Sequence, residues 1–218
     1  MKIGWIGCTL LALLVVACAA PPRPAAQGST ATSAEALAAA IAADAQRSED
    51  ETDPAVRAEL ADESSRDAEA CLAREPQTVA CLYGHAVAMG LEARAHPTRA
   101  LELLNKMLEE LTSAEAADPT YDEAGPARVR ALVLSRAPGW PLGPGDAAAG
   151  LVAARRAVTL RPQYPPNLLA LAEAQAKTGD ASGAQESYAR ARDVAQVLPA
   201  SADRDKWLRQ ADQALQRK

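Results

Sequence analysis

The chain has 218 residues, of which 53 are alanine and none is phenylalanine, and aromatic residues make up only 3%. Alanine is the strongest helix former, so this composition predicts an all-α protein whose helices pack closely through small side chains. The formal net charge of −5, without a basic stripe that could follow a row of phosphates, argues against a nucleic-acid partner.

The first twenty residues have the pattern of an export signal. Lys2 supplies the positive end, and Ile3–Ala17 is an apolar run too short to span a bilayer as a stable helix. The run ends in the letters VVAC at Cys18, which resembles a bacterial lipobox. This resemblance implies that residues 1–17 are a signal peptide and that the Cys18 sulfur carries a diacylglyceryl group with acyl chains such as palmitate. The alternative is an ordinary secretory signal cleaved near Ala20.

A lipid on Cys18 would hold the mature chain in the cell envelope, facing the periplasm. Ala19 rather than aspartate follows the cysteine, which in the enterobacterial pattern favours the outer membrane over the inner one. Residues 18–32 (CAAPPRPAAQGSTAT) are rich in Pro, Ala, Ser and Thr and have no apolar period, a composition that predicts a flexible tether. The folded domain is expected to occupy residues 33–218.

The rest of the chain predicts helices separated by proline and glycine. Thr32-x-x-Glu35 has the spacing of a capping box and predicts a first helix that ends near Arg47. Asp53-Pro54 pairs an N-cap with a first-turn proline and predicts a second helix that reaches about Arg74.

A third helix is predicted over 78–93, and Pro97 begins a fourth. Leucines at three- and four-residue steps predict one buried seam on the fourth helix: Leu101, Leu104, Leu108 and Leu111. Asp118-Pro119 and Gly125-Pro126 bracket a turn before a short fifth helix, and four more helices follow Asp146.

The segment after residue 144 repeats itself. Gly145-Asp146 recurs 34 residues later as Gly179-Asp180. This period, with a short Gly-Asp turn followed by small residues, resembles the tetratricopeptide (TPR) repeat. The matched packing positions are Gly150, Ala154 and Ala157 in one unit and Ala184, Tyr188 and Ala191 in the next. The resemblance implies antiparallel helix pairs stacked as a right-handed solenoid of about nine helices, closed by a polar-backed last helix.

Cysteine and histidine are the residues to consider for a disulfide or a metal. Cys71 and Cys81 flank the turn at Pro76, so they could form a disulfide, and the alternative is two small buried residues. His85 lies four residues after Cys81, but no second pair of ligands completes a zinc site, which favours a structural histidine. No phosphate loop, nucleophile elbow or metalloprotease motif is present, so we expect neither an enzyme nor a cofactor or metal.

One connection is longer than a repeat turn. Residues 136–146 (RAPGWPLGPGD) contain three prolines and three glycines and predict an ordered loop that presents Trp140 and Leu142. Such loops on rigid scaffolds often bind partners, and Arg136, Trp140 and Leu142 are therefore a candidate binding loop. The alternative is that Trp140 folds back over the neighbouring helices.

Several short motifs lie between residue 79 and the C-terminus: Tyr121-Asp122-x-x-Gly125, Arg136-Ala137-Pro138, Gly145-Asp146, Pro162-x-Tyr164-Pro165 and Leu171-Ala172-Glu173. Together they resemble the T-component family of TRAP transporters, which are TPR-like, helical periplasmic lipoproteins. The resemblance implies contact with a periplasmic solute-binding protein and a role in delivering apolar or acidic organic ligands.

The leading functional hypothesis is a lipid-anchored, non-enzymatic module that binds a protein in the periplasm, as a TRAP-transporter accessory. The first alternative is a carrier whose helices enclose an apolar small ligand, with the Trp140 loop at the rim. The second is a general scaffold for cell-envelope assembly. A homo-oligomer is compatible with each of them.

Overall fold

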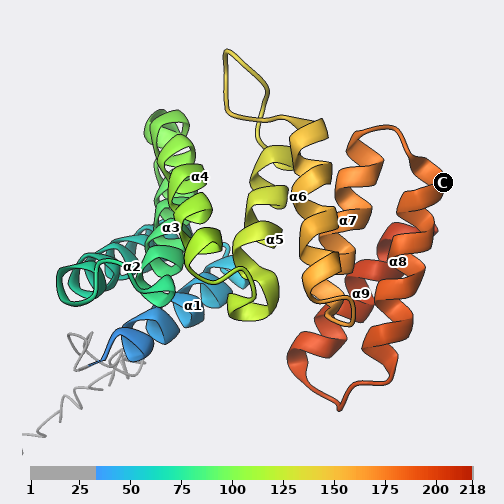
Figure 1. The fold of residues 1–218 in the computed structure, drawn as a ribbon, viewed down its shortest axis with the longest axis horizontal. Coiled ribbons are helices and arrows are strands. Elements are labelled where there is room, and N and C mark those ends of the chain that lie inside the picture. The colour runs from blue at the N-terminus through green and yellow to red at the C-terminus, as the bar shows by residue number, and fades with distance from the viewer. Residues whose placement is uncertain (1–32, 218) are drawn as a thin grey trace, which may run out of the picture. The chain divides into compact units, whose positions relative to one another are not determined.

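The computed structural model describes residues 33–217. The predicted signal peptide, the lipid site at Cys18 and the tether lie outside these residues. The described part contains nine α-helices, one short 3₁₀ turn and no strand (Figure 1). The helices are α1 (Ala34–Asp50), α2 (Pro54–Arg74), α3 (Val79–Ala95), α4 (Ala100–Ala117), α5 (Tyr121–Arg136), α6 (Ala147–Leu160), α7 (Pro165–Lys177), α8 (Ala181–Gln196) and α9 (Ala202–Gln216), with the 3₁₀ turn at Pro97–Arg99. None of these described helices combines the length and the apolar character needed to cross a bilayer.

Short polar side chains set where several helices begin. Asp53, Asp146 and Asp180 are N-caps whose carboxylates accept hydrogen bonds from backbone N–H groups of the first turns of α2, α6 and α8. The cap of α1 is Ser33, whose hydroxyl accepts from Ala36 N, so the capping box predicted at Thr32 was wrong by one residue.

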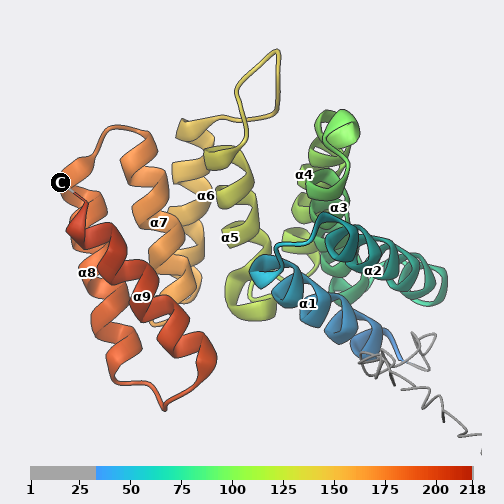
Figure 2. The same ribbon diagram turned by 180° about the vertical axis from the view of Figure 1, so that it is seen from behind.

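Consecutive helices pack as hairpins. α1 packs on α2, α3 on α4, α5 on α6 and α7 on α8, and α9 lies against α8 (Figures 1 and 2). The first helices of neighbouring pairs also meet, α1 with α3 and α5 with α7. This alternation places the odd-numbered helices next to one another, on one side of the array.

Alanine dominates the core. Of the 34 hydrophobic residues that are buried in the described part, 22 are alanine. A methyl side chain lets two helix backbones approach closely and loses no rotamer freedom on burial. The few large side chains that are almost fully enclosed include Leu37, Ile41, Leu111 and Leu168.

The buried seam of α4 differs from the prediction. The buried residues of α4 are Leu103, Met107, Leu111 and Ala114, whereas Leu101 is 46% exposed. The leucines of α4 fit two neighbouring rows of four-residue steps, and the contact with Met89 and Ala93 of α3 selects the row through Met107. The predicted row therefore lies at the edge of the contact, except for Leu111.

The N-terminus of α5 has an unusual backbone. Asp122, Glu123 and Ala124 have φ of 47°, 54° and 64°, a left-handed turn made without glycine. Such a conformation costs roughly 1–2 kcal/mol per residue, so specific contacts must hold it. The regular right-handed helix follows from Gly125, in agreement with the turn predicted before Pro126.

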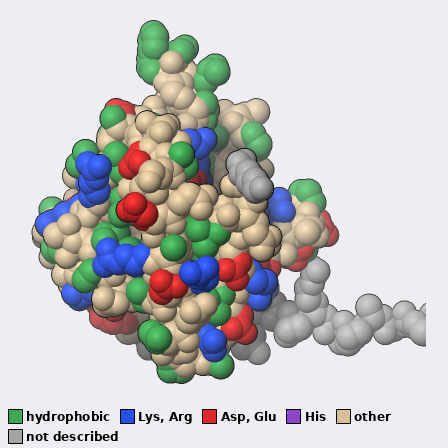
Figure 3. Space-filling view, turned by 90° about the vertical axis from the view of Figure 1, so that its right-hand side faces the viewer, with side chains coloured by type: hydrophobic (Ala, Val, Ile, Leu, Met, Phe, Trp, Pro, Cys, Tyr) green, Lys and Arg blue, Asp and Glu red, His purple; other side chains and the backbone are tan. Residues whose placement is uncertain are grey.

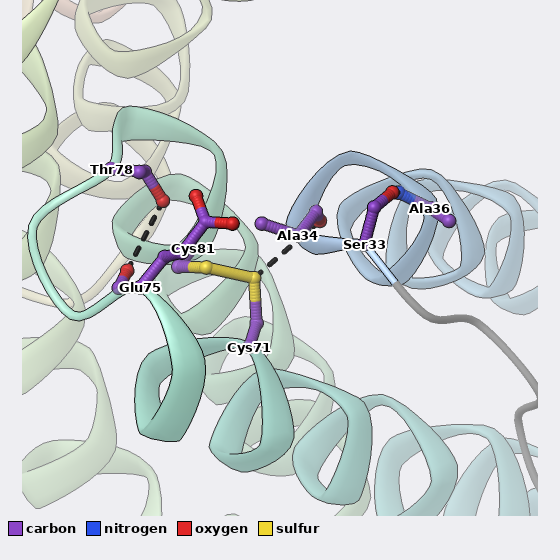
Figure 4. The surroundings of a disulfide bond; sticks show 7 residues. All are labelled: Ser33, Ala34, Ala36, Cys71, Glu75, Thr78 and Cys81. Atoms are coloured by element: carbon purple, nitrogen blue, oxygen red, sulfur yellow. Dashed lines mark hydrogen bonds between the residues drawn. A yellow bond between two sulfur atoms is a disulfide. The ribbon is translucent and has the colours of Figure 1, made fainter.

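A disulfide joins the end of α2 to the start of α3 (Figure 4). The Cys71 and Cys81 sulfurs are 2.05 Å apart, and both residues are fully buried beside Ala34 and Leu37 of α1. The bridge therefore closes the first corner of the array, where α1, α2 and α3 meet.

Candidate functional site

The odd-numbered helices line a groove. Its volume is ≈ 940 Å³, and its walls come from α1, α3, α5, α7 and α9, with a contribution from α4. Apolar side chains from all six helices line it: Ile41, Val87, Leu91, Leu104, Met107, Val129, Leu132, Leu169 and Trp207. Charged side chains from the five odd-numbered helices lie at the same surface: Glu35, Glu49, Arg94, Arg136, Glu173, Asp203 and Lys206. The groove is thus lined by apolar side chains together with charged side chains of both signs.

Aromatic side chains are concentrated in this groove. The described residues include six tyrosines and tryptophans, and four of them line it: Tyr83, Tyr121, Tyr164 and Trp207. They form two edge-to-face pairs, Tyr83 with Tyr121 and Tyr164 with Trp207, each with ring centroids 5.6 Å apart. Rigid aromatic surface suits contact with an apolar ligand because few rotatable bonds must be ordered on binding.

Arg128 connects the two aromatic pairs and holds the left-handed turn. Its guanidinium donates to the carbonyls of Asp122 and Glu123 at 3.0 and 3.2 Å and to the Asp122 carboxylate at 2.6 Å. Its Cζ lies 5.2 Å from the centroid of the Tyr164 ring, and Tyr83 Oη donates to the same Asp122 carboxylate at 2.8 Å. Strain in the turn is thus balanced by one buried cation and its partners.

Asn167 completes this network from α7. Its side-chain amide donates to the Glu123 carbonyl at 2.9 Å, and its Oδ1 accepts from Arg128 at 3.2 Å. Asn167 is fully buried, so these bonds satisfy a polar group that would otherwise be costly to enclose. Neither Arg128 nor Asn167 was predicted from the sequence, because the contact that joins them spans 39 residues. The available signal was an asparagine at the apolar start of α7.

Burial and charge shift the pKa values of this network. Burial raises the pKa of the Tyr83 hydroxyl well above its ordinary value, so the group stays protonated and remains a donor to Asp122. Desolvation works against the charged Arg128 guanidinium, but its ion pair and hydrogen bond with Asp122 help to raise the pKa of Arg128 above its ordinary value. Tyr83 and Arg128 therefore keep their protonation states over the physiological pH range and act as a fixed support.

The second feature is the loop between α5 and α6. Gly145 N donates to Pro138 O at 2.9 Å, and Asp146 N donates to Leu134 O at 2.9 Å, so the two ends of the loop are fastened together. A Cβ on Gly145 would lie 2.1 Å from Ala137 O, which shows why glycine is required at this crossing.

The tip of the loop is apolar and exposed. Trp140 is 91% exposed and Leu142 77% exposed, and residues 137–145 carry no charge. The tip projects beyond the ends of the flanking helices in Figure 1 and forms the hydrophobic projection at the top of Figure 3. A hollow of ≈ 420 Å³ lies between the loop and Leu101 and Asn105 of α4. The structure therefore does not place Trp140 over the neighbouring helices.

Arg136 does not belong with the loop tip. Its guanidinium donates through Nε and Nη2 to the two carboxylate oxygens of Glu173 in α7, both at 2.7 Å. This hydrogen-bonded pair raises the pKa of Arg136 and turns its side chain toward the groove. Of the three residues predicted for the loop site, only Trp140 and Leu142 lie together.

The six repeat-packing residues lie where two helices approach. Gly150 is the closest contact, because a Cβ there would lie 2.6 Å from Ser135 Oγ and 3.3 Å from Ala131 O of α5. Ala154, Ala157, Ala184 and Ala191 are buried, and Tyr188 is half-buried against Leu168 and Leu169 of α7.

His85 faces a carboxylate. Its Nδ1 lies 3.4 Å from Glu110 Oε1 of α4, and the Cys81 sulfur is bonded to Cys71. Within residues 33–217 no group of three or more His, Cys, Asp or Glu side chains is arranged to hold a metal ion.

Comparison with known proteins identifies the type of fold. No protein-family model matches the chain, and no curated protein sequence matches it. Among solved structures, the chain is similar to a thermophilic TPR protein from Thermus thermophilus, with 23% identity and a TM-score of 0.55. The alignment covers 83% of this chain and 89% of that one. Together with the stacked helix hairpins, this similarity shows a TPR-like all-α solenoid.

Proposed function

We propose that this chain is a lipid-anchored, non-enzymatic module of the bacterial cell envelope that binds a protein partner through the α5–α6 loop. The partner class we favour is a periplasmic solute-binding protein, with the chain as a TRAP-transporter accessory. The motif resemblance described above supports the transporter context, and the TPR-like fold supports binding without chemistry.

The observation that carries the proposal is the exposed loop tip. A tryptophan that is 91% exposed gains apolar burial only when another molecule covers it. The fastened neck and three prolines restrict the loop before binding, so less conformational entropy is lost on association. The hollow beside Leu101 is of a size to accept side chains of a partner.

Replacing Trp140 with alanine tests this proposal. We expect partner affinity to fall by about 30-fold or more, because a central tryptophan often contributes ≥ 2 kcal/mol to an interface. The melting temperature should stay unchanged, because so exposed a side chain contributes little to the fold. Affinity is measured by titration with a periplasmic solute-binding protein of the same bacterium, and stability by thermal denaturation.

Val197→Ala is the matched control, since Val197 is 82% exposed and lies between α8 and α9, away from the loop. It should change neither quantity. Unchanged affinity of Trp140→Ala for a partner that does bind would remove the loop from the interface.

The groove favours a second candidate function. A volume of ≈ 940 Å³ with four aromatic side chains fits a carrier for an apolar small molecule. Trp140 does not line this groove, so the loop tip is not the rim that the alternative hypothesis placed there. In this case bound ligand should lie against Tyr121 and Trp207, and Trp140→Ala should leave its affinity unchanged.

The lipid anchor has a test of its own. Cys18→Ser should abolish acylation, because serine supplies no sulfur for the thioether, and should leave an uncleaved precursor or a soluble species. Intact-mass spectrometry and detergent phase partition report this directly. A Cys18→Ser protein that still has the mature mass and still partitions with detergent would contradict the lipobox interpretation. Ala19→Ser, one residue further on, is the control and should remain lipidated.

A further inference from the structure

The helices of the groove belong to two groups. Within residues 33–217, α1 packs only on α2 and α3, and α9 packs only on α7 and α8. The first group, α1–α4, meets the second, α5–α9, where α4 and α3 contact α5. On that side the contact includes apolar packing of Val129 and Val133 and the ion pair of Arg130 with Glu115 at 3.0 Å.

On the opposite side, the groove is closed by side-chain contacts between α1 and α9. Gln46 of α1 donates to Asp203 of α9 at 2.5 Å. Lys206 of α9 donates to Glu49 at 2.5 Å and lies 3.4 Å from Asp50. The Cα atoms of the two helices nevertheless stay more than 8 Å apart, so the connection consists of side chains alone.

These five residues, which we call the α1–α9 clasp, lie at the edge of the groove. Four of them, all except Asp50, line it directly. The clasp is mostly solvated, because Glu49 and Asp50 side chains are 62% and 76% exposed and Lys206 is 31% exposed. Exposed ion pairs are weak and are screened by salt, so this closure can open easily.

Each end helix is held firmly by its own group. Ile41 and Leu37 of α1 are buried against α2 and α3, and Ala211 of α9 is buried against Leu168 and Leu169 of α7. Separating α1 from α9 would therefore break the polar contacts of the clasp and leave the apolar contacts of both end helices intact. Two groups of helices can rotate about their contact at one edge when each group is well packed internally and only polar side-chain contacts join them at the other edge.

We propose that the α1–α9 clasp is a gate, which holds the groove closed through Lys206 and Asp203 and opens when these charges are screened or repelled. The movement is a rotation of α1–α4 relative to α5–α9 about the α4–α5 contact. The importance of the gate for ligand entry rests on the carrier function above, but the movement itself does not depend on any ligand or on the partner of the loop.

The test measures the distance between the two groups in the full-length protein. Nitroxide labels at Asp62→Cys in α2 and Gln185→Cys in α8, both exposed positions, report it by double electron–electron resonance. Lys206→Glu would place a third acidic group beside Glu49 and Asp50. We expect a longer and broader distance distribution than in the parent protein, with unchanged helix content by circular dichroism.

Two variants make the result specific to the clasp. Arg209→Glu makes the same charge change at an exposed position on the same helix and should leave the distances unchanged. Combining Glu49→Lys with Lys206→Glu restores opposite charges and should return the distribution toward that of the parent. Protein without the introduced cysteines, treated in the same way, supplies the labelling background.

A salt titration of the doubly labelled parent covers the case in which Lys206→Glu fails to fold. Raising NaCl from about 0.05 M to about 1 M, where the Debye length is only about 3 Å, should shift the distances in the same direction. The gate would be overturned by distances that do not change with salt, by an equal change in Arg209→Glu, or by a charge-swapped variant whose distances do not return toward those of the parent. The clasp would then consist of ordinary surface ion pairs.

Discussion

Replacing Arg128 with methionine is expected to lower the free energy of unfolding by about 3 kcal/mol, measured by urea denaturation of the full-length protein. The methionine keeps most of the apolar stem but removes every hydrogen bond that the guanidinium donates to Asp122, Glu123 and Asn167. Asn167 Oδ1 would be left buried without that partner, and the left-handed turn would lose its main support. Because the Asp122 side chain is 43% exposed, water screens the ion pair, and most of the loss should come from the buried bonds.

The matched control is Arg155→Met, since Arg155 is exposed on α6. This change should stay within about 0.5 kcal/mol of the parent. Asp122→Asn should fall between the two, because Arg128 then keeps its backbone carbonyl partners. Equal stability of Arg128→Met and the parent would mean that residues 122–124 hold their conformation without this network.

Loss of the disulfide is the second large effect. The double variant Cys71→Ala, Cys81→Ala should be less stable by about 2–3 kcal/mol, because a bridge across ten residues restricts the unfolded chain by that amount. Equilibrium unfolding in urea, with and without reductant, measures it. The parent should lose the same stability in dithiothreitol, whereas the double variant should not respond.

The comparison with reductant separates the bridge from the packing of the two residues. A double variant as stable as the oxidised parent would contradict the chain-entropy argument. A parent that is insensitive to reductant at equilibrium would mean that the thiols alone, packed beside Ala34 and Leu37, supply the stability.

Local patterns in the sequence predicted most helix boundaries correctly. Asp53-Pro54, Asp146 and Asp180 act at the positions that their chemistry indicates, because capping involves backbone groups only two or three residues away. Where two local solutions compete, the prediction failed. Ser33 rather than Thr32 caps α1, and the buried row of α4 passes through Met107 rather than Leu104.

The site could be predicted only in part, because several of its contacts join residues that lie far apart in the chain. The Trp140 loop was visible because its prolines and glycines are close together in the sequence. Arg128 and Asn167 are 39 residues apart, and Lys206 and Glu49 are 157 apart, so no local period indicates either contact. The groove results from the stacking of helices, which brings Tyr121 near Tyr83 without any pattern that relates them in sequence.

The alanine core has a consequence for how such a protein can change over generations. In most cores the damaging substitutions remove atoms and leave cavities, but at these 22 buried positions almost every substitution adds atoms. A larger residue at Ala154 or Ala157 has no room unless a facing residue shrinks at the same time. Paired replacements across a helix contact should therefore be the usual route of divergence, and the exposed faces should drift much faster than the contacts. Related chains would then keep the helix spacing while sharing few identical residues.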